Sequence, residues 1–127
     1  EFIEQTDRIL LRIEEYDSVR TIYMADALPA EGPPPSLLGY SVGHWENDTL
    51  VVHTSRVNYP YFNESGVPQS EAAEFVEYIT ASDDASRLDY KIVVTDPNIF
   101  SEPVVLQKSW VWLSGVSVEP YNCLVGD

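Results

Sequence analysis

Apolar and polar residues alternate with a period of two along most of this chain, and that pattern restricts it to β-structure. Successive side chains of a strand point to opposite faces of a sheet, so a strand with one buried face alternates in this way. RILLRIEE at 8–15 puts Ile9, Leu11 and Ile13 on one face, and LDYKIVVT at 88–95 repeats the pattern. Further strands are expected in these ranges: 19–24, 39–57 as a hairpin, 73–80 and 104–113.

EAAEFVEYIT at 71–80 fits two periods. Its apolar residues match helical spacing, and they also match an alternation that Glu77 interrupts. The turn-forming cluster ASDDAS at 81–86 and the clean strand after it favour the second interpretation. We therefore predict a hairpin of 73–80 with 87–95.

The segments between the strands are rich in residues that break regular structure. Residues 25–38 hold four prolines and a glycine, which predicts a long surface connection or an edge cover. Loops are expected at 58–70 and 96–103, and the tail from 114 could add a short strand. About eight strands without intervening helices predict one all-β domain over 1–127, either an antiparallel, lipocalin-like barrel or a sandwich.

The composition indicates an acidic globular protein. A chain of 127 residues with 44% hydrophobic content can form one core and is too apolar to be disordered. Asp and Glu outnumber Lys and Arg by 21 to 7, giving a formal net charge of −14. Such a surface repels phosphate groups, which argues against nucleic acids and anionic membrane surfaces as partners. No apolar run approaches the roughly 20 residues that a membrane span requires.

Two features bear on processing and redox state. Cys123 is the only cysteine, so its thiol is expected to be buried and inert or to pair with another chain or a missing segment. The sequence begins at Glu1 without Met and enters a strand-like pattern almost at once. This suggests a processed or trimmed product, which allows for a lost signal peptide.

GHWENDTLVVH at 43–53 holds the only two histidines, one on each side of a turn. Asn47-Asp48 suits a two-residue turn, because both residues tolerate left-handed backbone angles. Paired residues of a hairpin share a face. One face then carries Tyr40, Val42, His44, Glu46, Thr49, Val51, His53 and Ser55. The other face carries Ser41, Gly43, Trp45, Leu50, Val52 and Thr54.

In this register His44 and His53 become diagonal neighbours, with Glu46 one step further on. Two imidazoles and a carboxylate can ligate a divalent metal or form an acid–base pair. A three-residue turn would shift the pairing by one residue and separate the histidines. The opposite face is the more apolar one, so these side chains are alternatively ordinary residues of a solvated face. We assign no metal or cofactor to this pattern.

The same hairpin resembles a known group of sequences. VGHWENDTLVVHT at 42–54 is similar to the pattern V-G-x-W-E-x-D-T-L-V-V-x-T of a large group of uncharacterised bacterial exported proteins. The similarity continues, in order, in RTIY at 20–23, PQSEA at 68–72, RLDYKIVVTDP at 87–97 and EPYNC at 119–123. The resemblance implies a β-rich secreted or periplasmic domain, usually made with a signal peptide, and it implies no activity.

This chain departs from the group at two positions. Position 44 is usually Arg and position 69 usually His, where this chain has His44 and Gln69. Ser70 and Glu71 match the group's pattern. They would act in catalysis only if His44 or His53 reached Ser70 across the fold, because a serine nucleophile needs a base. Otherwise they cap or bridge the loop that enters the next strand.

Aromatic side chains supply a candidate ligand site. The residues concerned are Trp45, Tyr59, Tyr61, Trp110 and Trp112. Aromatic rings at the mouth of a barrel favour a small apolar or aromatic molecule, and core packing is the alternative. Gly43-His44-Trp45 is also similar to the Gly-x-Trp of lipocalin-like barrels, where that motif lies on the first strand.

Three functions follow as hypotheses. The first is an exported domain that binds a small ligand or a partner without chemistry, with a cavity of roughly a few hundred Å³. The second is an isomerase or hydrolase with His44 or His53 as base and Glu46, Glu71 or Ser70 assisting. The third is a structural subunit that pairs with neighbouring copies at its sheet edges.

Overall fold

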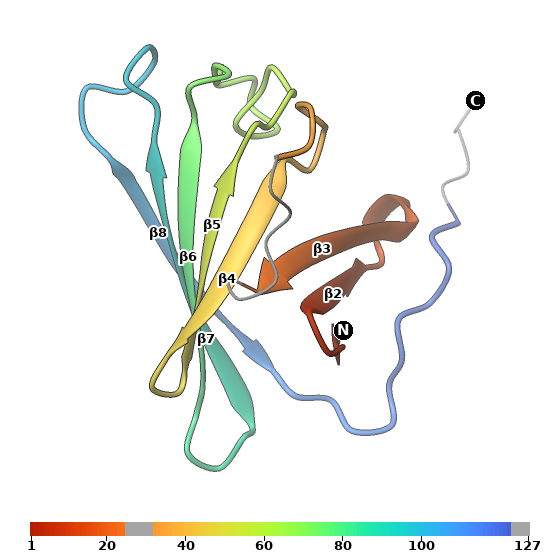
Figure 1. Ribbon diagram of the computed structural model, residues 1–127. Helices are drawn as coiled ribbons and strands as arrows, with labels where there is room; N and C mark the ends of the chain where they lie inside the picture. The colour runs from red at the N-terminus through yellow and green to blue at the C-terminus, as the bar shows by residue number, and fades with distance from the viewer. Residues whose placement is uncertain (25–31, 123–127) are drawn as a thin grey trace.

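The computed structural model describes residues 1–24 and 32–122, which form one β-sheet of eight strands (Figure 1). Each strand pairs with its neighbours in sequence, so β1 and β8 lie at the two edges. The strands are β1 (Phe2–Glu4), β2 (Arg8–Ile13), β3 (Ser18–Met24), β4 (Tyr40–Glu46), β5 (Thr49–Ser55), β6 (Glu74–Ala81), β7 (Arg87–Thr95) and β8 (Val104–Val111). Cys123 and the start of the proline-rich connection lie outside the described residues.

The sheet curls through 207° into a half-barrel, which confirms the all-β prediction. The predicted strands correspond to β2 to β8, with ends that differ by a few residues. Two details differ from the sequence prediction. β1 was not expected, and residues 112–122 contain no strand. Among the described residues, no helix is long and apolar enough to cross a membrane.

The pairing of β3 with β4 is parallel, whereas the sequence pattern had predicted antiparallel neighbours throughout. A parallel pair needs a long connection that returns the chain to the same end, and the proline-rich segment after Met24 has that length. Gly43 lies at this junction, opposite Met24. A β-carbon at Gly43 would approach Ile22 Cγ2 to 2.9 Å, so glycine lets the two strands pack closely.

The buried core lies on the inside of the curl. The core cluster consists of Ile9, Ile22, Leu50, Val52 and Ile79, from β2, β3, β5 and β6. Strands this far apart in the sheet contribute to one cluster only on the concave face. The alternation predicted from the sequence therefore holds, with Ile9 of β2 and Leu88 and Tyr90 of β7 on the core side.

Glu77 explains the interrupted alternation of β6, because it is buried on the concave face as half of an ion pair. Its carboxylate accepts hydrogen bonds from both terminal nitrogens of the Arg20 guanidinium, one of them at 3.0 Å. The side chains of Arg20 and Glu77 are only 13% and 7% exposed. The pair links β3 to β6 across two intervening strands.

Neighbouring hydroxyl groups complete this network. Arg20 Nε donates to Ser41 Oγ at 3.0 Å, and Arg20 Nη2 donates to Thr54 Oγ1 at 2.7 Å. The Tyr90 hydroxyl donates to Glu77 Oε2 at 2.8 Å. Burial, together with the charge of Glu77, raises the pKa of Tyr90, so its hydroxyl remains a donor at neutral pH. Within the described chain, every buried polar side-chain atom has a hydrogen-bond partner.

Removing one partner of the Arg20–Glu77 ion pair is expected to destabilise the fold strongly. Glu77→Ala leaves the buried guanidinium of Arg20 without a counter-charge, which should lower the free energy of unfolding by about 3–5 kcal/mol. The double variant Arg20→Met, Glu77→Leu desolvates no charge and should lose much less. Urea unfolding followed by tryptophan fluorescence measures both.

A matched control is Asp89→Ala, which breaks the exposed Arg87–Asp89 ion pair and should leave stability almost unchanged. If Glu77→Ala cost no more than this control, the buried pair would not hold the half-barrel together.

Candidate functional site

The hairpin of β4 and β5 brings the two histidines together in the predicted register. His44 faces Val51, Val42 faces His53, and the left-handed φ of 53° at Asn47 makes the turn. The rings of His44 and His53 stack with centroids 6.3 Å apart, and His44 Nε2 lies 3.0 Å from Glu46 Oε1. The predicted neighbourhood of His44, His53 and Glu46 is therefore confirmed.

This cluster lies on the convex face of the sheet, away from the core. His53 and Glu46 are exposed and His44 is half-exposed. His53 borders a small hollow of about 170 Å³ together with Tyr40 and Glu74. In the described part of the chain, no group of three or more His, Cys, Asp or Glu is arranged to hold a metal ion. The cluster thus offers a substrate no enclosed site.

Ser70 is held by an acid rather than by a histidine. Its hydroxyl donates to Asp96 Oδ1 at 2.6 Å and its backbone N–H donates to Asp96 Oδ2 at 2.6 Å. The backbone N–H of Asn98 also donates to Asp96, and the Asn98 amide donates to Ser70 Oγ. Glu71 is exposed. These contacts join the loop before β6 to the loop after β7, which fits a structural role for Ser70.

Asp96 is 1% exposed, yet it stays charged. Burial would raise the pKa of its carboxyl group, but the hydrogen bonds from Ser70 and Asn98 outweigh that effect and hold the pKa below its usual value. A lowered folded-state pKa adds stability above the unfolded-state pKa of about 3.9, and this stability is lost as the pH falls below it.

Asp96→Asn is therefore expected to destabilise the protein at neutral pH. The loss should be about 1–3 kcal/mol, because the half-buried donors of Ser70 lose their charged acceptor. The difference between wild type and variant should shrink as the pH is lowered from 7 to 3. Urea unfolding at several pH values measures it, and a difference that stayed constant with pH would contradict the assignment.

The aromatic residues predicted to bind a ligand fall into separate groups. Tyr59 and Tyr61 make an edge-to-face contact at 6.0 Å in the loop after β5. Trp110 packs on Tyr90 at 4.9 Å on the concave face. Trp45 is on the concave side of β4, and Trp112 lies beyond the end of β8; both are exposed. Within the described residues, no ring contact joins the Tyr59 group to the Trp110 group.

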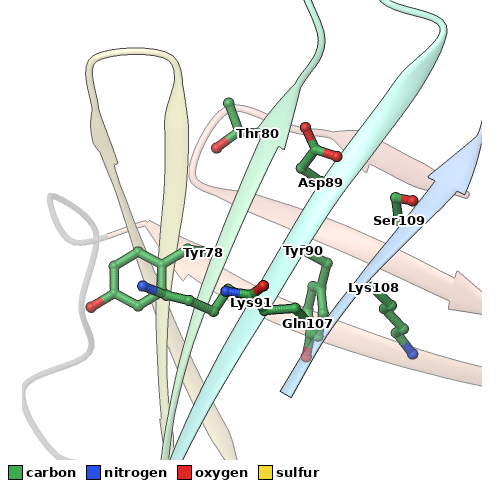
Figure 2. Close-up of a pocket in the computed structure, with 8 residues that line it drawn as sticks. All are labelled: Tyr78, Thr80, Asp89, Tyr90, Lys91, Gln107, Lys108 and Ser109. Atoms are coloured by element: carbon green, nitrogen blue, oxygen red, sulfur yellow. The ribbon is translucent and has the colours of Figure 1, made fainter. Parts of the chain in front are cut away.

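The larger hollow lies over β6, β7 and β8 and has a volume of about 450 Å³ (Figure 2). It is shallow and mostly polar, in contrast to the apolar cavity expected from the sequence. The Lys91 ammonium lies 4.5 Å from the centre of the Tyr78 ring, and Thr80 shares a hydrogen bond with Thr49 at 2.8 Å. Lys91, Tyr78 and Thr80 therefore already have partners within the sheet.

β8 is the most unusual element of the surface, because it is a long edge strand with one side unpaired. In the part of the chain that the structure describes, β8 pairs only with β7 (Figure 1). The N–H of Trp112 donates to the Ser86 carbonyl oxygen at 2.8 Å, toward β7. Residues of an antiparallel strand alternate in the direction of their N–H and C=O groups. The free edge is therefore formed by the backbone groups of Val105, Gln107, Ser109 and Val111.

The side chains of β8 are also uncovered. Val105 and Leu106 point to opposite faces, yet they are 53% and 49% exposed. Trp110 and Val111 show the same pattern at the other end of the strand. Natural edge strands are normally protected by charges, prolines, bulges or shortness. β8 carries one charge, Lys108, and contains no proline, although Pro103 directly precedes it.

The composition around β8 differs from that of the rest of the chain. Residues 103–118 contain no Asp or Glu, although the chain has 21 acidic residues. Sequence reasoning had placed 104–113 as the last long strand and missed that it stays unpaired on one side. The absence of acidic residues over 103–118 was the sequence signal that set this strand apart from the others.

Comparison of the chain with protein-family models, curated proteins and solved structures found no match. The resemblance to exported bacterial proteins therefore stays a prediction. The candidate functional features are therefore the four described above. They are the histidine cluster on the convex face, the hydrogen-bonded pair of Ser70 and Asp96, the polar hollow and the free edge of β8.

Proposed function

We propose that the protein is a non-catalytic binding domain that takes up an extended segment of a partner along β8. The observation that carries this proposal is the free backbone edge of β8, flanked by exposed apolar side chains on both faces. An extended segment that adds to such an edge gains main-chain hydrogen bonds, and the alternating side chains add specificity.

The geometry favours binding over chemistry. The histidines lie on an open convex face, and the hydroxyl of Ser70 is hydrogen-bonded to Asp96. An acid–base pair needs a substrate held within hydrogen-bond reach, and an open face provides no such enclosure. An exported location is part of the proposal, and its support is the resemblance of 42–54 and the later motifs to exported proteins.

A proline at the free edge is expected to abolish strand addition. Gln107→Pro removes an outward N–H and leaves the ladder to β7 intact, because Gln107 directs no backbone group toward β7. Gln107→Ala removes the same side chain and keeps the N–H, so it is the matched control. The probe is a fluorescent, capped peptide of alternating valine and threonine with lysines at both ends, whose charge suits an acidic protein.

Fluorescence anisotropy with dilute protein measures the affinity. Wild type and Gln107→Ala should bind the peptide alike, and Gln107→Pro should bind at least about tenfold more weakly. Equal binding by all three proteins would contradict strand addition at β8, and so would an absence of peptide binding in a protein that also stays monomeric at high concentration. Far-UV circular dichroism and urea midpoints confirm that the variants are folded.

A further inference from the structure

We propose that the partner taken up by β8 is a second copy of this chain, paired antiparallel across a two-fold axis at Gln107. This inference rests on the proposed function and names its partner. It joins two half-barrels edge to edge into one continuous sheet.

Symmetry restricts how two copies of β8 can pair. A two-fold axis that relates antiparallel edge strands runs perpendicular to the sheet, so some residue of β8 must lie opposite itself. The axis also keeps the concave face of one copy continuous with the concave face of the other. Gln107 and Lys108 are the two central residues of β8, and Ser109 is the next candidate for the axis toward the end of the strand.

The side chains distinguish these three registers. An axis at Lys108 places two ammonium groups directly opposite each other, which is unfavourable. An axis at Ser109 uses only the second half of β8, because the strand ends at Val111. An axis at Gln107 pairs 104–110 of one copy with 110–104 of the other, and Pro103, which has no N–H, marks its limit. Gln107 is therefore the preferred centre.

This register also pairs compatible side chains. On the concave face, the half-buried Val104 lies opposite Trp110 of the second copy, which covers the exposed indole ring of Trp110. Leu106 lies opposite Lys108, whose methylene chain can pack on it while the ammonium reaches solvent. On the convex face, Val105 lies opposite Ser109. The outward N–H and C=O groups of Val105, Gln107 and Ser109 gain partners in the second copy.

Charge argues for this edge as the contact between two acidic molecules. Each copy carries a net charge of −14, so two copies repel each other wherever acidic residues meet. The stretch 103–118 has no acidic residue and one lysine, so contact along β8 brings no carboxylates together. Salt screens the remaining repulsion over a Debye length of about 8 Å at physiological ionic strength. Association should therefore strengthen as salt is added.

Sedimentation equilibrium over a range of protein and salt concentrations tests the proposal. Wild type and Gln107→Ala should form dimers, more of them at high salt, and Gln107→Pro should stay monomeric. A cationic partner, such as the lysine-flanked peptide, should instead bind more weakly at high salt.

The outcomes separate the two proposals. If wild type stays monomeric at high concentration and high salt but binds the peptide, the second copy is wrong and strand addition stands. If it neither dimerises nor binds the peptide, both are wrong. A dimer that Gln107→Pro leaves intact would use another surface and would overturn this inference.

Cysteine cross-linking tests the register. In a Cys123→Ser background, Gln107→Cys places two thiols at a hydrogen-bonded pair about 5.5 Å apart between α-carbons, which is within disulfide range. Mild oxidation should cross-link this variant efficiently, and Lys108→Cys and Ser109→Cys poorly. Preferential cross-linking at Ser109→Cys or Lys108→Cys would overturn the Gln107-centred register.

Discussion

The half-barrel depends on one constraint, which is that a single sheet must bury its apolar face against itself. Ile9 and Ile22 reach Leu50 and Ile79 only because the sheet curls. The Arg20–Glu77 pair lies at the centre of that curl and links β3 to β6. A buried ion pair is weak support for stability as such, but removing one partner is costly. The pair therefore disfavours flatter arrangements that would separate β3 from β6.

A curl that stops at a half-barrel leaves two sheet edges, and the chain treats them differently. β1 has only three residues, and the exposed Glu1–Arg12 ion pair lies beside it. Such an edge is poorly suited to further pairing. β8 has eight residues, one lysine and apolar side chains on both faces. This asymmetry makes β8 the natural contact surface of an otherwise acidic molecule.

Local patterns predicted the strands and the hairpin register, since alternation and the Asn47-Asp48 turn are encoded within a few residues. They predicted the contact of His44 with His53, and the apolar Trp45 face indicated which side would be buried. They could not give the parallel β3–β4 pairing, because a proline-rich connection does not specify direction. They left Glu77 as an unexplained interruption, because its partner Arg20 is 57 positions away. β8 is as apolar as a central strand, so alternation alone could not place it at the edge, and only the lack of acidic residues over 103–118 set it apart.

Amide hydrogen exchange along β8 tests the central claim most directly. In dilute protein, the amides of Leu106, Lys108 and Trp110 should exchange slowly, because they point to β7. Those of Val105, Gln107 and Ser109 should exchange fast and become protected as concentration and salt rise. Odd-numbered amides that exchange fast under all conditions would show that β8 does not pair with a second copy. Odd-numbered amides that are protected even at high dilution would show that the edge is already covered.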